Sequence, residues 1–290
     1  MNTKLHLMLA VYALLVSGSF HVGHAITKDI DPVVLTFARF ALGAAIFWVI
    51  AHFRYGVKMP GLRELSGYTL ISLSLVGYFV AMFYALRYTT AVNTSMVYTL
   101  TPLFTAFFGA VILRERQTWP RIMMLCVTLI GCVWVISGGD VGVLMSLKFN
   151  RGDMLFLAGC VGMGLYPVLS KLFARGVPTP VLTFWTLLTG SIVLLLIANV
   201  DVVRTDWLAL PLRVYLGLGY ITVFTTAVTF FILQYVSMRM PVAKVMAYIY
   251  VIPVFSMLWS WLLGGSAVSM SMLAGAVTAI CGMVFFLRSE

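Results

Sequence analysis

Apolar stretches separated by short polar breaks run along the whole chain. Ten such stretches are predicted, over 5–25, 32–53, 68–88, 92–113, 119–137, 153–173, 180–200, 212–236, 241–263 and 269–287. Most are close to the roughly 20 apolar residues that a helix needs to cross the hydrocarbon core of a bilayer. Glycine, proline and charged residues mark the breaks, as in Lys58-Met59-Pro60-Gly61 and Pro178-Thr179-Pro180. The pattern predicts an all-α integral membrane protein with ten transmembrane helices.

Composition supports this interpretation. The 290 residues are 62% hydrophobic and 10% charged, whereas soluble domains average about 45–50% apolar and about 25% charged residues. The four cysteines lie inside apolar stretches and form no paired motif, so neither a disulfide framework nor a metal cluster is predicted. We expect no cofactor.

The basic residues predict the orientation of the chain. With a cytoplasmic N-terminus, 12 of the 19 lysines and arginines fall on the cytoplasmic side, six fall on the opposite side, and Arg39 lies within a span. This excess predicts that both termini are cytoplasmic. The net charge of +10 is scattered singly through the breaks, so a nucleic-acid partner is not expected.

The second half of the chain repeats the first. The tetrapeptide Val-Leu-Thr-Phe occurs at 34–37 and again 147 residues later at 181–184. Farther along, the offset becomes 151: Pro102 corresponds to Pro253, Phe79 to Phe230, Tyr84 to Tyr235 and Gly131 to Gly282. Each half, 5–137 and 153–287, holds five spans, and an odd number of spans inverts the second half relative to the first. Inverted repeats are typical of transporters that alternate access around a site at the membrane midplane.

The paired prolines indicate where such a site would lie. Pro102 and Pro253 interrupt the fourth and ninth spans, and each leaves a backbone carbonyl without its helical donor. Tyr98 and Thr101 lie beside the first break, so we expect them to face a cavity. The alternative is a packing kink that contacts no solute.

A single arginine lies within a predicted span. Arg39 is seven residues, or about 10 Å, from the start of the second span. A charge at that depth normally faces the interior of a bundle. It could bind the carboxylate of a substrate, or it could extend to the interface or bond to helix carbonyls.

Other large polar side chains are weaker candidates for the cavity. His21 and His24 lie in the first span and could relay protons, although satisfied interior histidines are common and no further metal ligands accompany them. Tyr166, Trp185 and Tyr248 could line the cavity, but tyrosine and tryptophan also anchor helices at membrane interfaces. We expect no metal site.

Three charged residues near the cytoplasmic ends of spans are candidates for a gate or for coupling. Lys171 and Lys244 could contact a solute, or could extend to the interface with a purely topological role. Glu115 is flanked by Arg114 and Arg116, which favours an interfacial ion-pair cluster.

No aspartate or glutamate lies deep in a predicted span. We therefore expect neutral, zwitterionic or anionic solutes rather than cations. A membrane-embedded enzyme would need a nucleophile, an acid pair or a metal set at membrane depth, and no such motif occurs. A non-transporting membrane sensor is a further alternative, with no output domain to support it.

The stretch Tyr84 to Ala91, continued by Leu100 to Phe104 and by Arg114 to Arg116, resembles the EamA-type family of the drug/metabolite transporter superfamily. The second half is similar around Pro253 and Gly264-Gly265, with Ser266 where the family usually has a glutamate. The resemblance implies a basket-shaped ten-helix bundle that exports small metabolites such as amino acids. It further implies a bacterial cytoplasmic (inner) membrane protein, monomeric or weakly oligomeric, with the lipid bilayer and a small metabolite as its partners.

Overall fold

The computed structural model describes residues 3–89, 91–116, 118–137, 140–146, 150–173, 176–262 and 270–288, and within them all regular secondary structure is helical. The first half contains α1 (Thr3–Ile26), α2 (Pro32–Tyr55), α3 (Leu62–Ala85), α4 (Ala91–Tyr98), α5 (Thr101–Ile112) and α6 (Trp119–Ile136). A short helix α7 (Val141–Ser146) precedes the second half. The second half contains α8 (Arg151–Phe173), α9 (Thr179–Arg204), α10 (Leu212–Thr222), the π-helix η1 (Val223–Val228), α11 (Thr229–Ser237), α12 (Val242–Met246), the 3-10 helix η2 (Ala247–Val251), α13 (Ile252–Leu262) and α14 (Met270–Arg288).

Among the described residues, seven helices are long and apolar enough to cross a membrane. They are Thr3–Ile26, Pro32–Tyr55, Leu62–Ala85, Arg151–Phe173, Thr179–Arg204, Leu212–Ser237 and Met270–Leu287. Three shorter apolar helices, Thr101–Ile112, Ile122–Trp134 and Val242–Ser256, lie within the remaining predicted spans. Helix therefore covers part of every predicted span, while the count of ten membrane crossings stays a prediction.

The shorter helices result from interrupted spans. Two turn residues separate α4 from α5, and Pro102 occupies the first turn of α5, where its missing N–H has no cost. In the second half, the 3-10 segment η2 precedes α13, and Pro253 again lies in the first turn. Both prolines therefore start new helical segments. Gly264, Gly265 and Ser266 lie outside the described residues.

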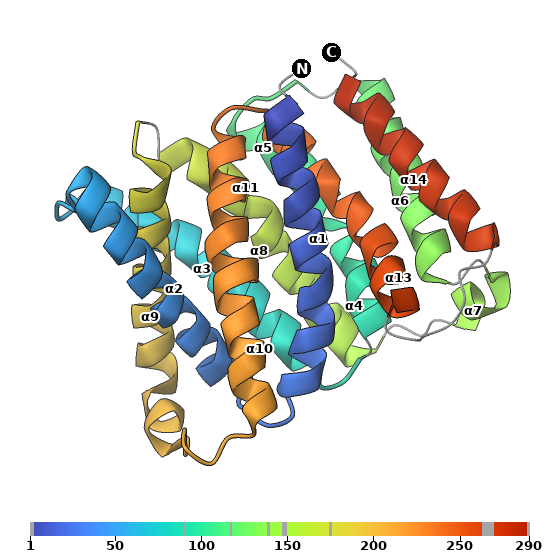
Figure 1. Ribbon diagram of the computed structural model, residues 1–290. Helices are drawn as coiled ribbons and strands as arrows, with labels where there is room; N and C mark the ends of the chain where they lie inside the picture. The colour runs from blue at the N-terminus through green and yellow to red at the C-terminus, as the bar shows by residue number, and fades with distance from the viewer. Residues whose placement is uncertain are drawn as a thin grey trace.

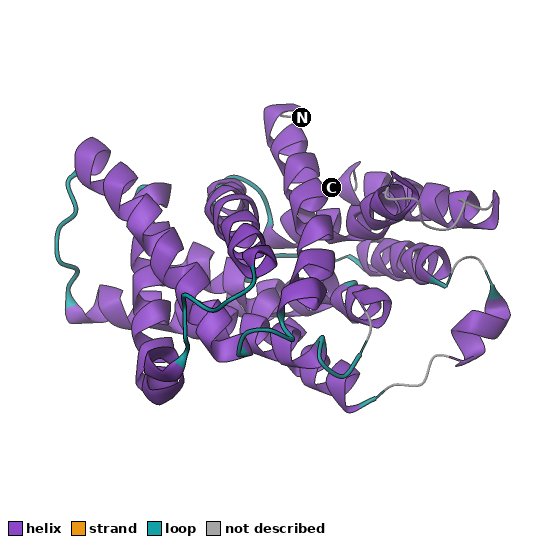
Figure 2. Cartoon of the chain, turned by 60° about the horizontal axis from the view of Figure 1, so that its bottom comes forward, coloured by secondary structure: helices purple, strands orange, loops and turns teal. Residues whose placement is uncertain are grey.

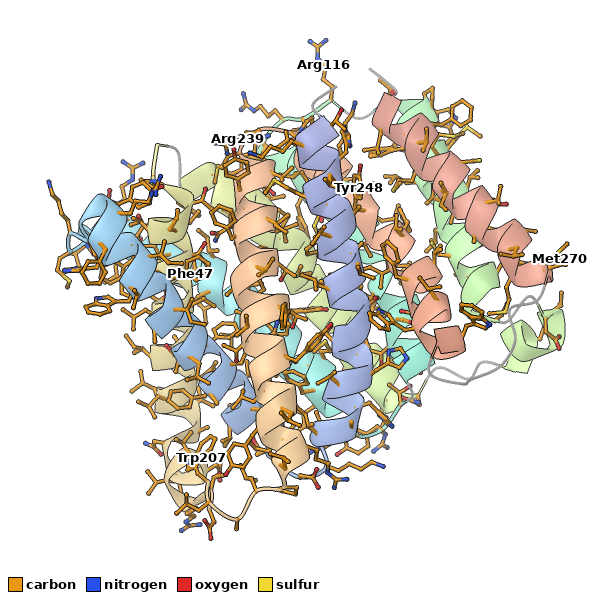
Figure 3. All side chains as sticks on the ribbon, in the orientation of Figure 1. Phe47, Arg116, Trp207, Arg239, Tyr248 and Met270 are labelled. Carbon is orange, nitrogen blue, oxygen red and sulfur yellow. The ribbon has the colours of Figure 1, made fainter. Side chains whose placement is uncertain are left out.

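The helices pack as an elongated bundle, with each half supplying one member of its main pairs (Figures 1 and 2). Helix α3 packs along α8, α2 along α9, and α6 along α14. The two termini lie at the same end of the bundle (Figure 1), which we call the near end. Arg116 and Arg239 lie at the near end, and Trp207 lies at the opposite, far end (Figure 3).

Two glycines related by the repeat allow α6 and α14 to cross closely. A Cβ at Gly131 would lie 2.7 Å from the backbone nitrogen of Ala279, and one at Gly282 would lie 3.2 Å from the backbone nitrogen of Thr128. The backbone of a packed helix cannot move aside for the added Cβ as the end of a flexible side chain can. The glycines that the sequence pairs across the halves thus fix one crossing from both sides.

We expect Gly131→Ala to destabilise the protein by about 1–3 kcal/mol, the usual cost of overpacking. The added methyl group must push α14 away from α6. Thermal unfolding of the detergent-purified protein measures the effect. Gly219→Ala is the matched control, because a Cβ there meets nothing within 4 Å; equal melting temperatures for the two variants would contradict this account of the crossing.

Candidate functional site

Arg39 is buried inside the bundle rather than extending to an interface. Its side chain is 1% exposed and belongs to α2. The guanidinium Nε donates to the hydroxyl of Thr226, and Nη2 donates to the carbonyl of Thr225 at 2.6 Å. No aspartate or glutamate in the described part of the chain forms an ion pair with it. The Nη1 atom is buried and has no hydrogen-bond partner.

The acceptors for Arg39 come from a local change in helix type. Thr225 and Thr226 belong to the π-helix η1, which interrupts the span formed by α10 and α11. A π-helical turn displaces backbone carbonyls from the regular ladder, and such turns are frequent at functional sites. Here the turn provides a carbonyl and two hydroxyl groups for a single guanidinium.

An aromatic cluster surrounds the remaining faces of the guanidinium. Its Cζ lies 3.8 Å from the ring centroid of Phe79 and 5.9 Å from that of Phe230. These two rings stack on each other, with centroids 5.8 Å apart and planes inclined by 24°. Phe79 and Phe230 correspond in the repeat, so Arg39 lies where equivalent residues of the two halves meet.

Buried polar atoms continue from this point toward the near end. On α8, the hydroxyl groups of Tyr166 and Ser170 are buried and form no hydrogen bond of regular geometry, although Tyr166 lies within interaction range of Ser170 and of Gln234. The Tyr166 ring centroid lies 5.7 Å from that of Phe230. On α11, Gln234 accepts a hydrogen bond from Thr183 of α9, while its Nε2 forms no hydrogen bond of regular geometry. We call Arg39, Tyr166, Ser170, Thr183 and Gln234 the polar cluster. Buried polar groups without well-formed hydrogen bonds are costly, so this cluster is suited to binding a polar ligand.

A cavity of about 800 Å³ opens at the near end, adjacent to the polar cluster. Its lining residues are Tyr55, Lys171, Gly176, Val177, Pro178, Thr179, Pro180, Phe231, Tyr235, Met238 and Arg239. Thr179 connects the two regions, since its carbonyl lies 2.8 Å from the hydroxyl of Thr183. Polar groups therefore extend from the cavity toward Arg39.

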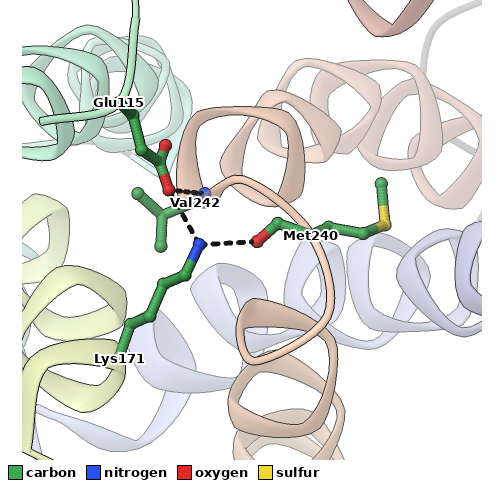
Figure 4. A network of polar contacts seen from close by, with 4 residues as sticks. All are labelled: Glu115, Lys171, Met240 and Val242. Atoms are coloured by element: carbon green, nitrogen blue, oxygen red, sulfur yellow. Dashed lines mark hydrogen bonds and ion pairs between the residues drawn. The ribbon is translucent and has the colours of Figure 1, made fainter. Parts of the chain in front are cut away.

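The predicted gate residues Lys171 and Glu115 contact each other beside this cavity (Figure 4). Lys171 Nζ lies 2.9 Å from Glu115 Oε1 and 3.3 Å from the carbonyl of Met240. The same Oε1 accepts the backbone N–H of Val242 at 3.2 Å. One ion pair thus joins the end of α5, the end of α8 and the turn before α12. The second carboxylate oxygen, Oε2, is buried without a partner.

Tyr98, at the first predicted break, lies in a buried aromatic cluster. Its hydroxyl lies 3.1 Å from that of Tyr12, and its ring centroid lies 5.4 Å from that of Phe20. Thr101 and Pro102 follow and are also buried, with the Thr101 side chain within interaction range of the Cys160 thiol. Pro253 is buried as well, and the nearby carbonyl of Tyr250 accepts from Cys132 Sγ at 3.2 Å. Ring contacts join Tyr98 to Arg39: the ring centroid of Tyr78 lies 5.7 Å from that of Tyr98 and 4.7 Å from that of Phe79, the ring that stacks on the guanidinium.

The structure places the other candidates away from Arg39. His21 is exposed on α1, and His24 Nδ1 lies 3.3 Å from the carbonyl of Leu86. Trp185 is buried against the ring of Tyr68, with centroids 6.5 Å apart. Tyr248 bonds to Nδ1 of His6 at 2.5 Å, and Lys244 donates to the carbonyl of Leu287 at 2.8 Å. Among the predicted residues, ring contacts connect Arg39 with Tyr98 through Tyr78 and Phe79, and with Tyr166 through Phe230. An ion pair joins Lys171 with Glu115.

Several residues of the site are missing from the sequence-based prediction. Nothing in the sequence distinguishes Gln234, Ser170 and Tyr12 from other polar residues of the predicted spans in which they lie. Thr226 stands out only as part of a threonine series at helical spacing, 222, 226 and 229. Nothing in that series signals a π-helix. No group of three or more potential metal ligands occurs in the described part of the chain.

Comparison with known proteins places this arrangement in a family. The model of the EamA-like transporter family matches residues 3–137 and 150–288, one match in each half. A transporter of Bacillus subtilis, YyaM, of uncharacterized function, is 24% identical over 98% of this chain and 93% of its own length. An uncharacterized transporter of Archaeoglobus fulgidus is 26% identical over 90% of this chain and 89% of its own length.

Two further similarities concern function and fold. A probable terminal-alkyne amino-acid exporter of Streptantibioticus cattleyicolor is 24% identical over 84% of this chain and 80% of its own length. One crystal structure covers 99% of this chain and 98% of its own with a TM-score of 0.77 at 20% identity, which shows a shared fold. The apolar helices and the family match in each half show a multi-pass membrane protein. The chain belongs to the EamA-like transporter family.

Proposed function

We propose that the protein is a secondary transporter that moves small carboxylate-bearing metabolites, amino acids among them, by alternating access. The observation that carries the proposal is the buried guanidinium of Arg39, which has no acidic partner in the described chain and an unpartnered Nη1. A buried charge is costly unless it is paired. A substrate carboxylate would supply the missing pairing, and arginine is well suited to bind it with two hydrogen bonds.

The same site favours some substrates over others. A cationic solute would be repelled by Arg39. The only buried acid in the described chain, Asp153, already accepts from Thr89 at 2.6 Å and from the backbone N–H of Asn150 at 2.9 Å. Neutral and zwitterionic solutes remain compatible with the buried polar groups of Tyr166 and Gln234. The amino-acid exporter among the relatives supports amino acids as the first class to test.

In the arrangement that we propose, the chain crosses the membrane ten times. The interrupted helices α4–α5 and α12–α13, together with α6, complete the seven long spans as two inverted halves, 5–137 and 153–287. The near end, which carries both termini, would then face the cytoplasm by the excess of basic residues. We infer that the near-end cavity is the cytoplasmic entrance and that the protein exports its solute across a bacterial inner membrane.

Reconstituted liposomes test the function directly. Purified protein should give saturable flux of at least one radiolabelled amino acid or related carboxylate in a broad panel, above the leak of protein-free liposomes. Comparing extracellular metabolites between deletion and overexpression strains would narrow the panel. The absence of flux for every compound would count against transport of this class.

A further inference from the structure

Two arginines lie at opposite ends of the bundle, 152 residues apart and so within one residue of corresponding positions in the repeat. Arg87 follows α3, and Arg239 follows α11, the end of the equivalent span in the second half. Each lies over a tyrosine from the last turns of its helix. The Cζ of Arg87 is 5.7 Å from the ring centroid of Tyr84, and that of Arg239 is 3.5 Å from that of Tyr235. These tyrosines are separated by the same 151 residues that separate Phe79 from Phe230.

Arg87 joins the end of α3 to the α1–α2 turn at the far end by hydrogen bonds. Its Nε donates to the carbonyl of Thr27 and its Nη2 to that of Ile30, both at 3.1 Å. These carbonyls belong to the turn that leads from α1 into α2, whose first residues are capped by Asp31. The end of α3 is thus tied to the start of α2. Charge-assisted hydrogen bonds of this kind are stronger than neutral ones.

Within the described residues, Arg239 does not make the equivalent contact at the near end. Its Nη1 donates to the carbonyl of Tyr235 in the preceding helix α11 at 2.7 Å, and no other side-chain hydrogen bond of Arg239 occurs in the described part of the chain. The counterpart of Ile30 is Val177, 147 residues later, just before the N-cap Pro178 of α9. Val177 and Arg239 both line the near-end cavity. The cavity therefore occupies the place where the counterpart of the Arg87 contact would form.

We propose that Arg87 and Arg239 are alternating clamps, of which one is engaged in each of two states. In the state seen here, Arg87 closes the far end while the cavity at Arg239 is open. In the opposite state, Arg239 donates to the carbonyl of Val177 and closes the near end, while Arg87 releases Ile30. The inference deepens the proposed transport function and rests on it, because two halves with the same fold can exchange conformations.

A linked pair of clamps makes a specific prediction about single variants. Removing Arg87 weakens only the state with a closed far end, so the population shifts toward a closed near end. Removing Arg239 weakens the opposite state and leaves the present one dominant. We therefore expect Arg87→Gln to increase accessibility at the far end and to decrease it at the near end. Arg239→Gln alone should change the accessibility of neither end, because the present state already dominates.

Thiol accessibility at the residue before each arginine measures both ends in the detergent-purified protein. Met238→Cys reports on the near-end cavity, and Leu86→Cys, 152 residues earlier and 1% exposed, reports on the far end. The exposed native thiols Cys126 and Cys281 are replaced by serine. The probe is a small cationic methanethiosulfonate reagent. In the parent protein, we expect rapid modification of the thiol at 238 and slow modification of the thiol at 86.

Arg87→Gln should raise the modification rate at position 86 and lower it at position 238, each by about tenfold. Changes of this size correspond to the shift between the two states that we expect from losing one to two charge-assisted hydrogen bonds. Adding Arg239→Gln to Arg87→Gln should restore rapid modification at 238, because neither clamp can then close the near end. Arg204→Gln, which removes an exposed far-end charge on α9, is the matched control and should change neither rate.

A rise at position 86 without a fall at position 238 would overturn the proposal, because it would mean local fraying of the far end. A fall at 238 that persists without Arg239 would overturn it as well. The modification rates need neither solute nor flux, so they separate the clamps from the proposed function. Opposite changes in a protein that carries no tested solute would support the clamps while counting against the transport proposal.

Discussion

Replacing Arg39 with lysine is expected to reduce carboxylate flux in liposomes by about 30-fold or more, since losing one partner of a buried charge pair costs roughly 2–5 kcal/mol. Lysine keeps the positive charge but not the planar fork, and arginine and lysine are not interchangeable where two parallel hydrogen bonds are needed. Its ammonium group also has three N–H donors, fewer than the four acceptors that Thr225, Thr226 and a carboxylate bound through both oxygens would present. Flux per molecule of reconstituted protein is the measurement.

The controls separate a binding defect from a folding defect. Arg204→Lys makes the same chemical change at an exposed position and should leave flux unchanged. Thr226→Val removes the acceptor of Arg39 Nε without altering any charge, and we expect an intermediate loss of flux with a monodisperse protein. Wild-type flux in both Arg39→Lys and Thr226→Val would show that the guanidinium does not bind the solute.

Reversing either charge of the near-end ion pair is expected to lower flux by about tenfold. Lys171→Glu and Glu115→Lys each place like charges where the native groups lie 2.9 Å apart, and repulsion of about 1–2 kcal/mol is reasonable for such a partly exposed pair. The double exchange should recover part of the flux. Full recovery is not expected, because Glu115 also accepts the backbone N–H of Val242, which lysine cannot do.

The exposed far-end ion pair provides the comparison. Arg213 bonds to Asp29 at 2.7 Å, but 64% of its side chain is exposed, so Arg213→Glu should have a much smaller effect. If the double exchange gave no more flux than the single variants, Lys171 and Glu115 would act independently. Wild-type flux in both single variants would show that the ion pair does not act as a gate.

Hydrophobic patterning predicts where the helices lie, and local polar contacts explain the differences at their ends. The helix predicted to begin at 68 starts at Leu62, because the polar residues before the apolar stretch are helical too. There, the Glu64 carboxylate accepts the backbone N–H of Gly61 at 3.0 Å. The helix predicted over 180–200 continues to Arg204 beyond a kink at Ala198. Neither extension changes the apolar pattern, so the pattern alone could not have indicated them.

The site was predictable only in part, for a similar reason. A lone arginine in an apolar stretch is visible in the sequence, and so is a repeat that pairs Phe79 with Phe230. The partners of Arg39 are not, because the π-helix that offers Thr225 and Thr226 gives no signal in its residue types. Helical spacing also groups His21 with Ser17, yet His21 is exposed on the outside of α1. Periodicity identifies a shared face but not which neighbour that face meets.

Distances between spin labels at both ends test alternating access most directly. One pair, at Tyr55 and Met238, spans the near-end cavity; the other, at Lys28 and Arg151, spans exposed positions at the far end. With a transported solute added, we expect two populations in each distance distribution, with the near-end distance shortening as the far-end distance lengthens. A single unchanged distance at both ends, in the presence of a solute that the liposomes transport, would contradict the account.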